Sequence, residues 1–279
     1  MSDRHDAGEP YVLGHTRREL DRLDLQGALY RDVTRRALVA GGVAPGIRVL
    51  DLGSGSGDVA FLAAELVGPD GSVLGIEREA GTVEAARSRA LRRAEVNVTF
   101  RVAAGSDLLE DGPFDALIGR FILMHQPDPS ATLRGALRNI RSGGAVVFVE
   151  SCMAAIAGYH SMPHSPLYDA VVRWKCAVVS GAGADLEAGF RLRRTYMRAG
   201  LPEPVTRFEA CVEGGPDSRL YAYMAESVRS MLPQARALGI RGFDDATVDT
   251  LADRLRNEVV SQDGVLMIWP VVAAWARVP

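Results

Sequence analysis

Between residues 45 and 150, short continuous apolar runs alternate with stretches in which apolar positions recur every three or four residues. The first pattern is typical of buried strands and the second of helices. Alternating strands and helices imply parallel βαβ units. The pattern therefore predicts an α/β protein with a doubly wound sheet.

The limits of the elements can be read from the same pattern. Strands are expected up to residue 51 and at residues 72–76, 98–102, 115–120, 145–150, 204–212 and 265–278. Helices are expected at residues 11–40, from residue 59, at 130–140, at 187–199 and within 217–261. Ser130 is the predicted N-cap of its helix, which Gly143 and Gly144 are expected to stop.

The first strand runs into a glycine-rich segment, V-L-D-L-G-S-G-S-G-D, which spans residues 49–58. Gly53, Gly55 and Gly57 alternate there with serines and a final Asp58. Glycine adopts positive φ and lets a ligand approach the backbone, and the helix that follows directs its N-terminal amides at that ligand. The segment predicts a nucleotide-type site at the end of the first strand.

Three templates compete for this loop. The dinucleotide pattern G-x-G-x-x-G, started at Gly53, needs a glycine where the chain has Asp58; started at Gly55, it ends on Ala60, which a looser form admits. A phosphate-binding loop of the Walker type needs Gly-Lys-Ser/Thr, which is absent. The acidic-x-Gly-x-Gly-x-Gly pattern of residues 51–57 fits directly. It resembles motif I of the class I S-adenosylmethionine (SAM)-dependent methyltransferases, where a carboxylate such as Asp51 serves the positive charges of SAM directly or through water.

A second carboxylate, Glu77, ends the next predicted strand. A carboxylate at this position can accept both ribose hydroxyls, in nicotinamide enzymes as in methyltransferases. Arg78 follows and is a candidate to stack along the adenine.

The segment from residue 119 to 150 makes the resemblance to a particular group of methyltransferases more specific. G-R-F-I-L-M-H-Q-P-D-P, followed by R-S-G-G-A-V-V-F-V-E, resembles the UbiE-like methyltransferases that act on small molecules. The likeness is good over residues 45–150 and loose elsewhere. It implies a Rossmann-like, mostly parallel seven-stranded sheet, SAM as cofactor with S-adenosylhomocysteine as product, and a small-molecule acceptor.

The chain departs from the family where the third strand ends. The family usually has Gly-Asp-Ala there, with the Asp on the adenine amino group, whereas this chain has A-A-G-S-D at residues 103–107. Backbone groups of Ala104 and Gly105 take over that role, or the carboxylate is displaced to Asp107. Ser106 is a further candidate for the adenine contact.

The resemblance also predicts how the chain is organised. Residues 1–42 form an N-terminal tail and cap helices, residues 43–150 the SAM-binding core, and residues 151–279 the rest of the sheet with helical insertions that form a substrate lid. The whole is expected to be a single catalytic domain. The last strand is expected to be antiparallel and inserted between the fifth and sixth. Helices that cross the opening of the sheet make Tyr11, Gln26 and Tyr30 candidates to cover SAM.

Methyl transfer requires the acceptor to be positioned, and a base only where the acceptor must lose a proton. His125 is the leading candidate base, since its loop lies beside the methionine end of SAM in the family; Glu150, His160 and His164 are the others. Arg120 is assigned to SAM or its loop. The aromatic and methionine content after residue 150 favours a flat, apolar acceptor, methylated on oxygen, nitrogen or carbon. The candidate substrate residues are Tyr159, His160, His164, Tyr168 and Trp174.

The amino-acid composition limits the classes of partner that the protein is expected to bind. The net charge is −3 and the isoelectric point near 6.0, so no overall field favours nucleic acid. Arginine clusters at residues 87–93 and 191–198 are interpreted as solvated helix faces. Three cysteines without metal spacing, no apolar leader and no apolar run of membrane-spanning length favour a cytoplasmic protein without a metal. The family leaves room for a homodimer.

Two other functions remain open at this point. A SAM-binding module that does not methylate, or a cyclase, would share the same loop, because methyl transfer needs no obligatory side chain. A nicotinamide-dependent oxidoreductase is disfavoured by Asp58.

Overall fold

The computed structural model describes residues 11–103, 112–154 and 160–279. The strands are β1 (Arg48–Leu52), β2 (Ser72–Glu77), β3 (Val98–Val102), β4 (Phe114–Arg120), β5 (Ile140–Ser151), β6 (Ser161–Met162), β7 (Val205–Glu209), β8 (Val212–Gly214), β9 (Val265–Met267) and β10 (Val271–Arg277). The helices are α1 (Tyr11–Gly41), α2 (Asp58–Val67), α3 (Ala80–Arg93), the short 3₁₀ helix η1 (Leu123–His125), α4 (Pro129–Leu137), α5 (Pro166–Gly181), α6 (Ala188–Ala199), α7 (Leu220–Ala237), α8 (Asp245–Asp249) and α9 (Leu251–Val260).

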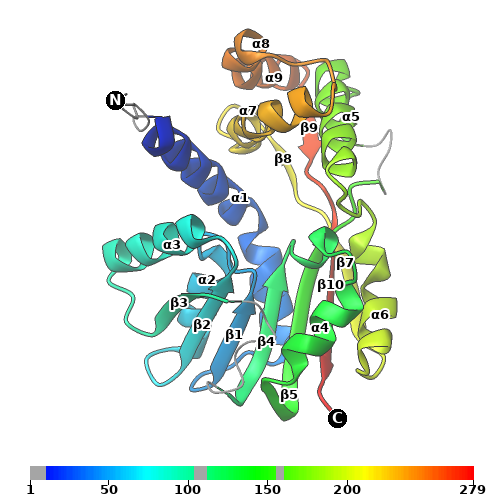
Figure 1. Ribbon diagram of the computed structural model, residues 1–279. Helices are drawn as coiled ribbons and strands as arrows, with labels where there is room; N and C mark the ends of the chain where they lie inside the picture. Colours follow the sequence, from blue (N-terminus) through cyan, green and yellow to red (C-terminus); the bar gives the residue numbers. More distant parts are fainter. Residues whose placement is uncertain (1–10, 104–111, 155–159) are drawn as a thin grey trace, which may run out of the picture.

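A seven-stranded sheet in the order β3-β2-β1-β4-β5-β10-β7 forms the centre of the molecule (Figure 1). Strands β1 to β5 pair in parallel, and β10 pairs antiparallel with both β5 and β7. This confirms the predicted doubly wound, mostly parallel sheet. It also confirms the last strand inserted between the fifth and sixth.

Helices cover both faces of this sheet, and each face has its own apolar core. Successive strand residues point to opposite faces, so Val49 and Val147 contribute to one core and Leu50 and Phe148 to the other. The first core includes α1, α2 and α3, and the second includes α4 and α6. Because both faces are covered, the central strands are continuous apolar runs.

Beyond one end of the sheet lies a second layer, the helical lobe, made of α5, α7, α8 and α9 with the small sheet β6-β9-β8 (Figure 1). The long helix α1 runs from the sheet toward this lobe and contacts α7. The small sheet was not expected. The sequence predicted one strand over residues 265–278, but the structure has two strands, β9 and β10, separated by residues 268–270. In this connection the carbonyl of Pro270 accepts a hydrogen bond from the amide of Cys152 at 2.8 Å.

The α4 segment also differs from expectation. Asp128, rather than Ser130, is the N-cap, and its side chain accepts the amide of Ala131 at 2.9 Å. Pro129 occupies the first helical turn, where its missing N–H costs no hydrogen bond. The helix ends at Leu137 and β5 already begins at Ile140, because pairing of Ile140 with Phe114 extends the strand backward.

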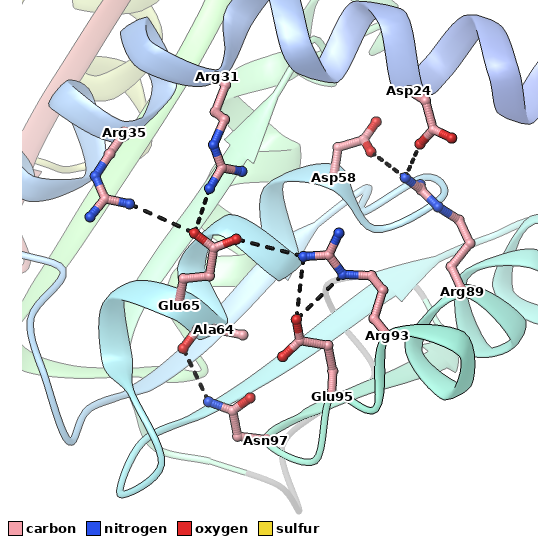
Figure 2. Close-up of polar contacts among 10 residues, drawn as sticks. All are labelled: Asp24, Arg31, Arg35, Asp58, Ala64, Glu65, Arg89, Arg93, Glu95 and Asn97. Carbon is pink, nitrogen blue, oxygen red and sulfur yellow. Dashed lines mark hydrogen bonds and ion pairs between the residues drawn. The ribbon is translucent and has the colours of Figure 1, made fainter.

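A buried arginine of α3 ties three elements together (Figure 2). Arg89, only 8% exposed, forms ion pairs with Asp24 of α1 and with Asp58 of α2, the latter at 2.8 Å. Its other terminal nitrogen donates to the carbonyl and the hydroxyl of Ser56, each at 2.7 Å. The sequence interpretation of a solvated basic face is therefore wrong for Arg89.

Among the described residues, no helix is long and apolar enough to cross a membrane. The same residues hold no group of three or more histidine, cysteine or acidic side chains placed to bind a metal ion.

Replacement of Arg89 by Met should destabilise the protein by about 3 kcal/mol, because it leaves Asp58 and Ser56 without their buried partner. Urea unfolding measures this change. Arg31→Met is the matched control, since Arg31 pairs with Glu65 at the surface and should cost less than about 1 kcal/mol. Equal losses for the two variants would contradict the assignment.

Candidate functional site

A cavity of about 440 Å³ opens between the loop after β1, α1, the end of β4 and the helical lobe. It is lined by Arg22, Leu23, Gln26, Tyr30, Gly53, Ser54, Gly55, Ser56, Asp58, Val59, Glu77, Arg120, Phe121, Ile122, Met124, His125, Ser151, Met153, Lys175, Val179, Tyr223, Ser230, Met231 and Trp269. Residues separated by more than 200 positions in sequence thus meet around one space. Such concave sites between layers are the usual location of small-molecule binding.

The glycine loop forms one wall of this cavity, and its glycines have different functions. Gly53, Gly55 and Gly57 all have positive φ, a conformation that other residues rarely adopt. A Cβ on Gly53 would clash with Ile122, and one on Gly57 would clash with Phe100, so these two glycines allow close packing inside the protein. A Cβ on Gly55 would meet no atom within 4 Å. Gly55 therefore faces open space at the cavity wall.

Glu77 reaches this loop from the end of β2. One carboxylate oxygen accepts the amide of Gly55 at 3.3 Å, and the other accepts the amide of Arg78 at 2.6 Å. Each carboxylate oxygen can accept more than one hydrogen bond. Glu77 can therefore accept further hydrogen bonds from the hydroxyl groups of a molecule in the cavity. The side chain of Arg78 is exposed and does not line the cavity.

Unpartnered polar atoms lie under the loop. Asp51 is 1% exposed and lies behind the cavity lining; its carboxylate oxygens have no well-aligned hydrogen-bond partner among the described residues, although the amide of Ala60 interacts with the carboxylate. Burial raises the pKa of Asp51 to about 8, although the positive charge of Arg120 opposes this shift. The hydroxyl of Ser54 is buried at the cavity wall and likewise has no partner in the described part of the chain. Buried polar groups without partners are costly, so this arrangement fits a ligand that supplies donors and positive charge.

Arg120 ends β4 on the other side of the loop. Its guanidinium donates to the hydroxyl of Thr34 at 3.0 Å and lies 6.0 Å from the ring centre of Tyr30. Burial lowers the pKa of Arg120, whereas Asp58 and Asp51 attract its charge. The predicted place of Arg120 beside the loop is consistent with these contacts.

The segment after β4 is held by Glu150, which the sequence offered as a candidate base. One carboxylate oxygen accepts the amides of Ile122 and Leu123 at 3.0 and 2.8 Å, and the other accepts that of Met124 at 3.3 Å. Burial raises the pKa of Glu150 to about 7, and the three amides oppose the shift. Glu150 is fully buried and does not line the cavity, so its observed role is to position the loop.

His125 lies at the end of η1, in the loop that Glu150 positions, and lines the cavity. His125 is exposed at the mouth of the cavity, and partial desolvation lowers its pKa, which favours the neutral imidazole that can accept a proton. Gln26 and Tyr30 line the cavity from α1 as the sequence predicted; the hydroxyl of Tyr30 donates to the carbonyl of Trp269 at 3.0 Å.

The candidate substrate residues do not gather at the cavity. His160 is 2% exposed and contacts Asp169 at 3.1 Å, and Tyr168 is buried with its hydroxyl on the carbonyl of Met267. Trp174 packs edge-on against Phe243 in the core of the lobe. These three aromatic side chains bury their apolar surface within the lobe, and none of them lines the cavity. His164 is exposed.

Several predicted positions are not described. Ala104, Gly105, Ser106, Asp107 and Tyr159 lie outside the described residues, as does the side chain of Tyr11. The adenine contact at the end of β3 and the covering role of Tyr11 stay predictions.

The residue that sequence reasoning missed is Lys175, on α5. It is 1% exposed and lines the cavity. Its ammonium lies 4.9 Å from the ring centre of Tyr223, 5.2 Å from that of Trp269 and 3.5 Å from the sulfur of Met224. Burial lowers its pKa to about 7, and the charge of Arg22 acts in the same direction. A signal was available, since Lys175 is the only lysine in the chain.

Comparison with known proteins identifies the family of this chain. A sequence family described as "Methyltransferase domain" matches residues 44–191, just over half of the chain. The chain belongs to the class I SAM-dependent methyltransferases. The matched span contains the glycine loop, Glu77, Arg120 and Lys175, and it confirms the resemblance seen in the sequence, with SAM as the cofactor of the family.

Individual relatives of this methyltransferase match part of their length. The arsenite methyltransferase of Aquipseudomonas alcaligenes is 37% identical over 136 residues, which cover 44% of this chain and 39% of the relative. The 2-phytyl-1,4-naphtoquinone methyltransferase of Synechococcus elongatus is 36% identical over 145 residues, or 51% of this chain and 58% of the relative. The chain thus spans less than two thirds of either relative.

A solved structure shows the same fold over a larger part of the methyltransferase. The YcgJ protein from Bacillus subtilis superposes with a TM-score of 0.57 at 14% identity, covering 89% of this chain and 99% of that one. This likeness supports the fold.

Replacement of Lys175 by Met should stabilise the ligand-free protein at pH 7. The folded state holds the pKa of Lys175 at about 7, well below the value of about 10.4 in an unfolded chain. Between these values the unfolded chain binds more protons, so wild-type stability rises with pH. The free energy of unfolding of the variant should exceed that of wild type by a difference on the order of 3 kcal/mol at pH 7, and this difference should shrink toward pH 10.

Urea unfolding of both proteins between pH 7 and pH 10 tests this difference. Arg254→Met is the control, because Arg254 is exposed on α9 and its removal should leave the pH dependence unchanged. A Lys175→Met protein that is less stable than wild type at pH 7, or whose gain is constant with pH, would show that Lys175 is not desolvated as described.

Proposed function

We propose that this protein transfers a methyl group from SAM to a small-molecule acceptor. The observation that carries the proposal is the cavity wall formed by Gly55, Glu77 and Ser54, whose hydroxyl has no partner in the described residues, with the buried Asp51 behind this wall. A positively charged ligand with hydroxyl donors supplies what these atoms lack. SAM has a sulfonium, an ammonium group and two ribose hydroxyls. Membership of the methyltransferase family supports the same ligand.

Different residues of the wall bind different parts of the cofactor. Glu77 accepts the ribose hydroxyls, as a carboxylate at the end of the second strand does in other nucleotide sites. Gly53, Gly55 and Gly57 shape the loop on which the cofactor rests, and Asp51 and Ser54 serve its cationic end. Arg120 is placed to hold the carboxylate of the methionyl group, and Gln26 and Tyr30 cover the cofactor from α1.

SAM supplies the reactive methyl group, and the protein acts by positioning the acceptor. Met231 of the lobe, together with Met153 after β5 and Trp269 before β10, completes the cavity with apolar and aromatic surface. This surface favours an apolar or aromatic acceptor. Where the acceptor must lose a proton, the cavity offers two groups that can take it, His125 and Lys175.

The shape of the cavity supports a single catalytic domain. Its lining comes from the predicted cap (residues 1–42), from the core (residues 43–150) and from the last part of the chain (residues 151–279). None of the three segments could form the site alone.

Gly55→Ala should lower SAM affinity at least about tenfold and cost only about 1 kcal/mol of stability. The new methyl group meets no protein atom but stands where the cofactor would touch the loop. Isothermal titration with SAM and S-adenosylhomocysteine measures the loss.

Gly46→Ala is the matched control for that variant. Gly46 also has positive φ and open space around it but does not line the cavity, so its stability cost should be similar and its SAM affinity unchanged. Unaltered binding by Gly55→Ala would overturn the proposed cofactor site.

Incubation with SAM carrying a labelled methyl group tests transfer itself. Label found in an acceptor supports the methyltransferase. Tight SAM binding without transfer to any of a broad panel of small acceptors would favour a module that does not methylate, or a cyclase.

A further inference from the structure

The acceptor side of the cavity contains a buried cation that no carboxylate balances. Lys175 forms no ion pair with an acidic group in the described part of the chain, although nearly all of its surface is buried. Its neighbours are the rings of Tyr223 and Trp269 and the thioether of Met224. These groups attract a cation but carry no negative charge.

The other cations of the cavity are placed differently. Arg22 is paired with Glu19 and donates to Gln26. Arg120 is attracted by Asp51 and Asp58 near the cofactor loop. The charge of Lys175 is left facing the space in which an acceptor would lie. A buried charge is stable when it is paired, so this space is suited to an anion.

We propose that Lys175 binds the acceptor as an oxyanion, and that the acceptor is a flat, apolar molecule with an acidic phenol or enol hydroxyl. This inference rests on the proposed methyltransferase function and assigns its substrate class. Tyr223 and Trp269 flank the ammonium with aromatic surface, and Val179 and Met231 extend the apolar lining. A planar conjugated ring fits between such side chains, whereas an inorganic anion would leave their apolar surface without contacts.

The proposed step is balanced without another reactant. The Lys175 amine takes the proton of the acceptor hydroxyl, and the resulting ammonium pairs with the oxyanion. An electron pair of this oxygen forms the new O–C bond to the methyl carbon of SAM, while the S–C bond breaks and leaves its pair on sulfur. The product ether is neutral, so it loses its ion pair with Lys175 and can leave, and the ammonium then releases its proton to water, which restores the amine. A lysine pKa of about 7 suits this cycle, since the free amine is present near neutrality.

Binding of paired probes tests the assignment. 4-Nitrophenol and 2-hydroxy-1,4-naphthoquinone are flat acidic hydroxyl compounds, and their methyl ethers have nearly the same shape without the acidic proton. Each is titrated into the protein saturated with S-adenosylhomocysteine, and the absorbance of 4-nitrophenol reports its ionisation. Wild type should bind at least one hydroxyl compound about tenfold tighter than its ether, and bound 4-nitrophenol should ionise about one pH unit lower.

Lys175→Met should remove this preference and leave the affinity for S-adenosylhomocysteine within about threefold of wild type. Lys175→Arg keeps the charge and should keep part of the preference. Arg254→Met removes an exposed charge from the same lobe and should behave as wild type. Circular dichroism of each variant establishes that it is folded.

Three results would overturn the inference. If the wild-type protein binds neither hydroxyl compound better than its methyl ether, the cavity has no oxyanion site. If the Lys175→Met variant keeps the preference for the hydroxyl compound, another residue binds the oxyanion. If Lys175→Met instead loses S-adenosylhomocysteine, Lys175 holds the cofactor carboxylate. Wild type that fails to bind S-adenosylhomocysteine at all contradicts the proposed function itself, a failure separate from the other three.

Discussion

The buried guanidinium of Arg89 fixes α1 over the edge of the sheet, and the cavity depends on that placement. The guanidinium contacts Asp24 of α1, Asp58 of α2 and Ser56 of the glycine loop at once. Because a buried charge is stable only with its partners, these three elements cannot shift independently. The contact of Tyr30 with Trp269 then links α1 to the chain that enters β10. The covering helix is therefore part of the site, although it precedes the first strand.

Charge is distributed unevenly around the cavity. Glu77 places a carboxylate where β2 ends, whereas Lys175 places positive charge on the lobe. Methyl transfer from a sulfonium to an oxyanion joins a cation and an anion, so opposite charges on the two walls would hold each reactant on its own side before the charges cancel. Both products are neutral, so the same charge distribution would bind the products less tightly than the charged reactants.

The cofactor wall could be predicted from the sequence, whereas the acceptor wall could not. The glycine loop and Glu77 follow local rules: a turn needs glycine, and parallel strands end at one edge. Lys175, His160 and Tyr168 belong to helices and loops whose buried face is known only once the packing partner is known. The aromatic residues attracted a binding interpretation but pack inside the lobe, and the isolated lysine among 31 arginines was the more informative signal. Arg89 was misassigned for the same reason, since helical spacing alone does not show which arginine faces inward.

The place of β10 has a consequence for biosynthesis. β7 lies at the edge of the sheet and pairs only with β10, which is also the antiparallel neighbour of β5. A ribosome that has completed β7 must still translate α7, α8 and α9 before β10 appears, which takes several seconds at about 5–20 residues per second. During that interval β5 presents an open edge of unpaired N–H and C=O groups. Unpaired edges of this kind invite association between chains, so the nascent protein should be most sensitive to chaperones and to aggregation in this interval, just before its sheet closes.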